Sequence, residues 1–186
     1  MAVNTVGTGG DYSTIASWEA ALPSALTEVE VAELVNESQS AGSSFTINVT
    51  TSATNYIEIR PVSGGEWYLG GSAELTSTQG GSWGVISFAG QTCHVYLKGF
   101  RIASSTSSQN ALRHHGITTS VPGDAFVILR DMFTACAGTG TSQFMAWGSS
   151  TYIRPTTSYN SVGMDNLGRL GLSSNYALLA AVNCTL

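Results

Sequence analysis

Three stretches of this chain repeat one pattern, in which an apolar strand is followed by a small or polar break and by a second short apolar stretch. They are residues 94–102, 126–133 and 177–186. A unit of this kind cannot bury its apolar face alone, so it buries that face by stacking on the next unit. Gly99 and Asp131 stand at two of the breaks, where the chain would turn a corner. The repeat therefore predicts strands that stack in parallel.

Short apolar stretches alternate with clusters of Gly, Ser, Thr and Asn along most of the chain, which is typical of β-structure. The predicted strands are residues 29–35, 45–49, 56–60, 85–88, 94–102, 126–133, 143–147 and 176–186. A β-sandwich would show regular hairpins with Asn-Gly or Asp-Gly turns, and neither dipeptide occurs in the sequence. A parallel β-helix, a solenoid of stacked coils, is therefore the better prediction.

One segment near the start has the period of a helix instead. Its apolar positions at helical spacing are Ile15, Trp18 and Leu22. Ser13 or Thr14 can cap the start of this helix, and Pro23 ends it because proline lacks the backbone N–H that a helix needs. The sequence thus predicts a short amphipathic helix within residues 12–23.

A glycine-rich turn, Gly7-Thr8-Gly9-Gly10-Asp11, precedes this helix, and residues 50–61 form a second recognisable segment. The turn and helix resemble the opening of right-handed parallel β-helix proteins, a superfamily that includes pectin-modifying enzymes and phage spike proteins. Residues 50–61 resemble a first-coil motif in uncharacterised β-helix proteins of phages and environmental bacteria. The resemblance implies that the helix plugs the end of a solenoid, and it covers about the first third of the chain.

The expected fold class is therefore all-β: a right-handed parallel β-helix with a short N-terminal capping α-helix. We expect a single domain, residues 1–186. Within it, residues 1–25 would form the turn and the capping helix, and residues 26–186 would form the solenoid coils. A chain of 186 residues is long enough to bury one core of its own.

The composition limits the classes of partner. Charged residues make up 10% of the chain, against about 25% in an average soluble domain. Hydroxyl and amide groups must then keep the surface hydrated, as in many β-rich extracellular and virion proteins. One lysine and six arginines are scattered along a chain of net charge −5, so we expect no nucleic-acid partner. Four glutamates between Glu28 and Glu37 are interpreted as one solvated face.

Two further features bear on location and on bound metals. No apolar run approaches the roughly 18 residues of a membrane span, and the first residues lack the pattern of a secretory signal peptide. We therefore expect no membrane association. We expect the chain in an extracellular virus particle, released by lysis of the host. Three cysteines without a CxxC spacing indicate neither a disulfide framework nor a zinc site.

The resemblance to pectin-active enzymes makes a catalytic site worth testing. Such enzymes cluster aspartates with an arginine or a lysine, whereas the four aspartates here lie far apart in sequence. Asp131 with Arg130 is the best acid and base candidate, while Asp11 and Asp124 have the setting of turn residues.

His114 and His115 are adjacent, and on a strand they would point to opposite faces instead of sharing a metal. The aromatic residues that could stack on sugars, or be buried instead, are Trp67, Trp83, Trp147, Tyr56, Tyr68, Tyr152 and Tyr159. The sequence predicts no catalytic residue, no cofactor and no metal ligand.

The function expected from these features is that of a structural virion module, a bacteriophage capsid decoration or a tail-associated spike-like protein without catalytic activity. The alternative is a polysaccharide-degrading or glycan-binding protein, such as a tailspike, a lyase, a glycoside hydrolase or an adhesin. Residues 177–186 read as a strand without a polar cap, so we expect something else to cover it. The expected partners are other copies of the chain, with a trimer favoured by the resemblance, a larger viral shell or tail protein, and a glycan in the alternative reading.

Overall fold

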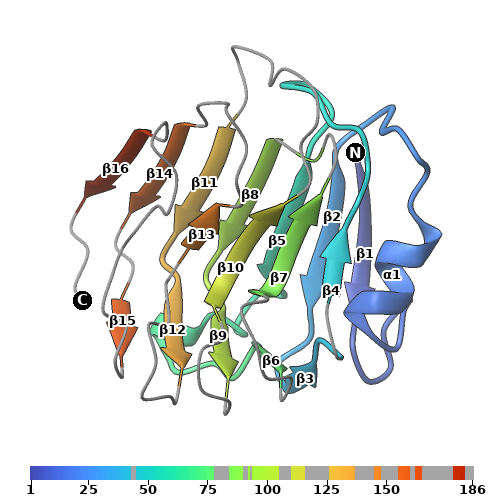
Figure 1. Ribbon diagram of the computed structural model, residues 1–186. Helices are drawn as coiled ribbons and strands as arrows, with labels where there is room; N and C mark the ends of the chain where they lie inside the picture. Colours follow the sequence, from blue (N-terminus) through green and yellow to red (C-terminus); the bar gives the residue numbers. More distant parts are fainter. Residues whose placement is uncertain are drawn as a thin grey trace.

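The computed structural model describes residues 1–42, 45–77, 84–89, 92, 94–104, 110–115, 126–136, 145–147, 155–159, 162–164 and 178–182. The strands in these segments form three parallel sheets, and one α-helix lies beside them at the end where the chain begins (Figure 1). Within each sheet the strands lie in the order in which they occur along the chain. Each strand therefore pairs with the strand of that sheet that comes before it and the one that comes after it in the sequence.

The three sheets differ in size. The seven-stranded sheet contains β1 (Ala2–Val6), β2 (Glu30–Leu34), β5 (Ile57–Pro61), β8 (His94–Lys98), β11 (Phe126–Arg130), β14 (Pro155–Tyr159) and β16 (Leu178–Val182). The five-stranded sheet contains β3 (Ser38–Ser40), β6 (Glu74–Ser77), β9 (Arg101–Ser104), β12 (Phe133–Cys136) and β15 (Val162–Met164). The four-stranded sheet contains β4 (Phe45–Ile47), β7 (Gly84–Ala89), β10 (Asn110–His115) and β13 (Met145–Trp147).

Alternation along each strand places apolar side chains on an inner face. Ala32, Ile59, Leu97 and Leu129 occupy equivalent positions of four neighbouring strands in the seven-stranded sheet, and all four are fully buried. They belong to one core cluster that also contains Leu75 of the five-stranded sheet, Ile86 of the four-stranded sheet and side chains of the helix. The core therefore joins all three sheets.

The helix α1 spans Ile15–Ala21, inside the segment predicted from the sequence. Thr14 is its N-cap. The Thr14 hydroxyl accepts a hydrogen bond from the backbone N–H of Ser17, and the Ser17 hydroxyl accepts one from the backbone N–H of Thr14. Ile15 and Trp18 are buried against the core. A helix of seven residues is marginal on its own, so this packing holds it in place.

The predicted corners are confirmed. Gly99 has φ of 76°, and Asp131 is the non-glycine residue with positive φ, 52°, among the described residues. Both lie between a strand of the seven-stranded sheet and a strand of the five-stranded sheet. The left-handed conformation turns the chain there, and glycine and aspartate tolerate it better than most residues.

The predicted fold class is wrong as stated. The sequence indicated an all-β right-handed parallel β-helix, whereas the described residues form three separate parallel sheets of unequal size and one helix that contributes to the core. The repeated stretches predict strands that stack in parallel, but they do not determine how many sheets the strands form or which sheet each strand joins. Several strands are short or carry only one or two apolar residues and were missed. They are β1, β3, β6, β10, β14 and β15.

The C-terminal strand predicted within residues 176–186 is present as β16, which pairs with β14 at the edge of the seven-stranded sheet; residues 183–186 lie outside the described residues. In the part of the chain that the structure describes, no helix has the length and the apolar character of a membrane span.

Candidate functional site

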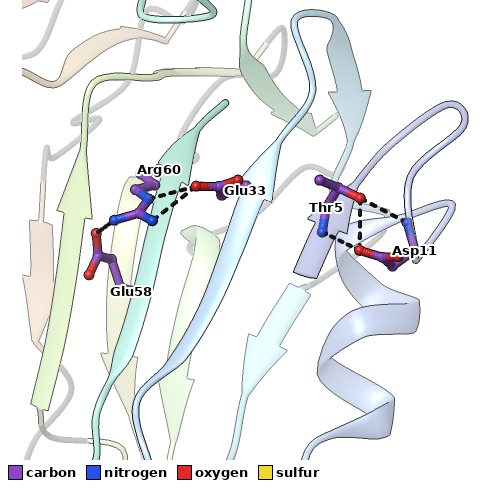
Figure 2. A network of polar contacts seen from close by, with 5 residues as sticks. All are labelled: Thr5, Asp11, Glu33, Glu58 and Arg60. Atoms are coloured by element: carbon purple, nitrogen blue, oxygen red, sulfur yellow. Dashed lines mark hydrogen bonds and ion pairs between the residues drawn. The ribbon is translucent and has the colours of Figure 1, made fainter. Parts of the chain in front are cut away.

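A row of charged side chains crosses the outer face of the seven-stranded sheet. Arg60 of β5 donates hydrogen bonds to the carboxylate of Glu33 on β2 through Nε, at 3.1 Å, and through Nη2, at 2.9 Å. Its Nη1 donates to Glu58, two residues earlier on the same strand, at 2.9 Å. Figure 2 shows this arrangement, in which one guanidinium joins two carboxylates on adjacent strands.

The surroundings of Arg60 act in opposite directions on its pKa. Burial alone would lower the pKa of the guanidinium, but the hydrogen bond that Arg60 donates to Glu33 and the charges of Glu58 and Glu33 more than offset that effect. The pKa of Arg60 is therefore raised, and the positive charge stays in place between the two carboxylates. This row links β2 to β5 across the outer face of the sheet.

A second polar network closes the edge of the same sheet. The Asp11 carboxylate accepts hydrogen bonds from the backbone N–H and the hydroxyl of Thr5, both at 2.8 Å, and the Asp11 N–H donates back to the Thr5 hydroxyl at 3.0 Å (Figure 2). The backbone N–H of Tyr12 donates to the carbonyl of Thr5. The loop after β1 thus occupies backbone groups that the edge strand would otherwise expose.

We expect Asp11 to titrate below its ordinary pKa of 3.8, because the Thr5 N–H and then the Thr5 hydroxyl stabilise the charged form. A lowered folded-state pKa gives stability that is present above the unfolded value and is lost as the pH falls through the folded value. Asp11→Asn should therefore reduce stability at neutral pH and cause little change at strongly acidic pH. Carboxyl-carbon NMR titration measures the pKa directly, and a midpoint at or above 3.8 would contradict the prediction. Thr5→Val keeps the backbone N–H and loses the hydroxyl, so it should raise the pKa of Asp11 only part of the way toward 3.8.

An aromatic and charged cluster lies on the outer face of the five-stranded sheet. Ser38, Glu74, Arg101 and Phe133 occupy equivalent positions of four neighbouring strands. Glu74 accepts hydrogen bonds from the Ser38 hydroxyl and from Arg101. The Arg101 guanidinium also lies over Trp67, with its Cζ atom 4.9 Å from the ring centroid. Such a cation–π contact attaches the segment that carries Trp67 to the sheet.

That segment, residues 62–71, is called the aromatic turn below. It contains a short 3-10 helix, η1 (Trp67–Leu69), and it is held by hydrogen bonds from the Trp67 N–H to the carbonyl of Gly99 and from the Gly71 N–H to the carbonyl of Glu66. Trp67 stacks on Phe133, with ring centroids 6.0 Å apart. The aromatic turn therefore packs over β9 and β12, the two strands that follow β6 in the five-stranded sheet.

Gly71→Ala should open the aromatic turn. A Cβ atom at Gly71 would lie 2.3 Å from the carbonyl carbon and 2.4 Å from the oxygen of Gly65, and backbone cannot move aside as a flexible side chain can. We expect a loss of about 1 to 3 kcal/mol, as for other overpacked sites. In hydrogen exchange, the Trp67 and Gly71 amides should lose protection. Ser63→Ala, at an exposed position of the same turn, is the matched control and should keep that protection; equal exchange in the two variants would contradict this packing.

Arg130 and Asp131, the predicted acid and base candidates, lie near the aromatic turn. The Nε atom of Arg130 is 3.5 Å from the Asp131 carboxylate. A hydrogen bond with Tyr96 is the largest of the effects that raise the pKa of Arg130, and the neighbouring Tyr68 adds to them. Lys98 lies directly opposite Arg130 in the next strand. Four outer positions, Tyr68, Tyr96, Lys98 and Arg130, therefore form a basic, aromatic surface.

The other residues named from the sequence are not brought together. Asp11 is at the β1 edge, and Asp124 and Asp165 lie outside the described residues. His114 and His115 are consecutive in β10, where His114 aligns with the buried Phe88 of β7. Within the described residues, no group of three His, Cys, Asp or Glu side chains is placed to hold a metal ion.

The predicted aromatic residues have different surroundings. Tyr68 is exposed, Trp67 is partly buried against Arg101, and Tyr56 makes an edge contact with Phe126. Trp147 lies in β13 and Tyr159 in β14, while Trp83 and Tyr152 lie outside the described residues.

The interpretation of the glutamates between Glu28 and Glu37 as one solvated face is wrong. Glu33 pairs with Arg60, Glu37 accepts a hydrogen bond from the Thr8 N–H, and Glu28 pairs with the N-terminal amine. Glu30, Glu33 and Glu37 are partly buried. Sequence reasoning also missed the roles of Arg60 and Arg101, each of which has a carboxylate partner 27 residues away on a neighbouring strand, Glu33 and Glu74 respectively. The one local signal was the Glu58-x-Arg60 spacing, which places both side chains on one face of a strand.

Comparison with known proteins adds no relative to this description: no family model, no curated protein and no solved structure matches the chain.

Proposed function

We propose that the chain is a structural module of a virus particle, such as a capsid decoration or a tail-associated spike-like protein, without catalytic activity of its own. The observation that carries the proposal is how the carboxylates are used. Eight of the ten carboxylates in the described residues bond to neighbouring strands, to turns or to an adjacent arginine. Those with such a partner are Asp11, Glu19, Glu33, Glu37, Glu58, Glu66, Glu74 and Asp131.

This use of charge suits a scaffold. A carboxylate that serves in acid–base catalysis must exchange a proton with a substrate. The carboxylates of Glu33, Glu58 and Glu74 instead bind arginines on the outer faces of two sheets, where Glu33 and Glu74 link neighbouring strands. The low charged fraction of the sequence, 10%, fits a surface hydrated by hydroxyl and amide groups, which supports the particle as the location.

The test is to purify particles of the virus that encodes the chain and to quantify the chain by mass spectrometry against the major shell protein. A fixed, multiple copy number in particles, with matching repeated density in cryo-electron microscopy maps, would establish the role. A chain that is absent from purified particles and abundant only in the free fraction of the lysate would exclude it.

A second candidate is binding of an acidic glycan, favoured by the surface formed by Tyr68, Tyr96, Lys98 and Arg130. Cations and aromatic faces are the groups that would hold a carboxylated sugar chain. Binding of acidic polysaccharides that is lost in Arg130→Ala, with no product formed, would identify a glycan-binding module. Turnover of a polysaccharide that is abolished by Asp131→Ala would instead establish an enzyme.

A further inference from the structure

Charge is distributed unevenly along the chain. Residues 1–60 contain seven Asp and Glu and one Arg, a net charge of −6. Residues 61–186 contain five Asp and Glu and six Lys and Arg, a net charge of +1. The strands of the seven-stranded sheet follow chain order, so the acidic first part of the chain contributes β1, β2 and most of β5 at one side of the sheet. The β1 side of the sheet is therefore the acidic side, and the rest of the chain is close to neutral overall.

The acidic end presents apolar side chains beside carboxylates. Val3 of β1 is 41% exposed and Met1 is 71% exposed. Glu30 lies beside Ala2 in the register of β1 and β2, and Glu28 precedes it. Burial, and then the charge of Glu28, raise the pKa of Glu30, while Glu28 forms an ion pair with the N-terminal amine. Met1, Val3, Glu28 and Glu30 are called the acidic edge.

The second surface has the opposite charge. Tyr68 is 53% exposed and Leu69 is 69% exposed, and both project from the aromatic turn. Beside them lie Lys98 and Arg130, two cations directly opposite each other on adjacent strands. Like charges in this position repel, and Asp131 offsets only part of that charge. Tyr68, Leu69, Lys98 and Arg130 are called the basic knob.

The exposed apolar residues point to the same two surfaces. Among the described residues, the large hydrophobic side chains that are exposed are Met1, Val3, Tyr68 and Leu69, two on the acidic edge and two on the basic knob. The basic knob is preorganised, because Trp67 next to Tyr68 is held by Arg101, Phe133 and the carbonyl of Gly99. A rigid tyrosine flanked by arginine is the composition of an interface hot spot.

We propose that copies of this chain associate through two different surfaces, with the basic knob of one copy, on the outer face beside β8 and β11, bound to the acidic edge of the next. The two surfaces differ, so the contact is heterologous, and repetition of it gives a ring where the rotation closes and a filament where it does not. A closed ring of three copies is the trimer expected from the sequence. The proposed structural role requires a partner, and self-association would supply one. Self-association can be measured on the isolated chain, so it does not depend on that role.

The test uses two variants of the full chain in sedimentation velocity at low salt. The edge variant, Val3→Ser with Glu28→Lys, alters only the acidic edge. The knob variant, Tyr68→Ser with Arg130→Glu, alters only the basic knob. Each alone should associate at least about tenfold more weakly than the wild type, the loss expected at a hot spot. An equimolar mixture should form dimers and nothing larger, because one intact edge and one intact knob remain. Ala20→Lys, an added charge on the exposed face of α1, should associate like the wild type.

Recovery on mixing also controls for folding, because a misfolded variant would not regain association. Raising the salt concentration from about 0.05 to 0.5 M should weaken the wild-type complex, since exposed charges are screened. A wild-type chain that stays monomeric at millimolar concentration, or oligomers that neither variant affects, would overturn the inference. Binding of acidic polysaccharide through Arg130 by a monomeric chain would do the same and would favour the glycan-binding candidate. The particle assay above is independent, so failure of self-association leaves the structural role standing.

Discussion

Trp18→Ala is expected to destabilise the protein by about 3 to 5 kcal/mol, the range for truncation of large buried aromatic side chains. Trp18 is 1% exposed and belongs to the core cluster, and α1 contacts β1 and β4. Because α1 has only seven residues, it depends on this packing. Loss of the indole should therefore release the helix from the end of the sheets. Equilibrium unfolding in urea, with the midpoint and the slope both fitted, measures the effect.

Two control variants on the same helix sharpen this prediction. Within the described residues the indole Nε1 of Trp18 has no hydrogen-bond partner, so Trp18→Phe removes part of the ring and no hydrogen bond. It should cost clearly less than Trp18→Ala. Ala20→Ser, on the exposed face, should stay within about 0.5 kcal/mol of the wild type. A change below about 1 kcal/mol for Trp18→Ala would show that α1 does not pack there.

Leu97→Ala should cost about 2 to 5 kcal/mol, because it opens a cavity in the inner face of the seven-stranded sheet. Leu97 is fully buried between Ile59 of β5 and Leu129 of β11, which occupy the same register position. Neighbouring strands are only about 4.8 Å apart and held by backbone hydrogen bonds, so they cannot collapse into the space. Denaturant unfolding provides the measurement.

The matched control lies on the same strand with the opposite orientation. Lys98 follows Leu97 and points to the outer face, so Lys98→Ala should change stability by no more than about 0.5 kcal/mol. Leu97→Met, which nearly conserves volume, should cost less than about 1.5 kcal/mol. If Leu97→Ala and Lys98→Ala had equal effects, the assignment of inner and outer faces in β8 would be wrong.

The sequence by itself determined the features that depend on neighbouring residues. The spacing of Ile15, Trp18 and Leu22, with Thr14 before them and Pro23 after, predicted α1, since a helix and its cap involve residues within one or two turns. The corners at Gly99 and Asp131 were predicted for the same reason, because the left-handed conformation is a property of a single residue. Apolar stretches predicted the strands that line the core, including β2, β5, β8 and β11.

Only the tertiary structure decided which strands share a sheet and which charged residues meet. The strand β3, Ser38–Ser40, has no apolar residue and is paired with β6 from 36 positions further along the chain. Arg60 finds Glu33, and Arg101 finds Glu74 and Trp67, through the register of strands that are distant in sequence. Register is fixed by backbone ladders and by burial of one face across the whole sheet. No local pattern contains that information, so the expected all-β solenoid was corrected to three unequal parallel sheets and a helix.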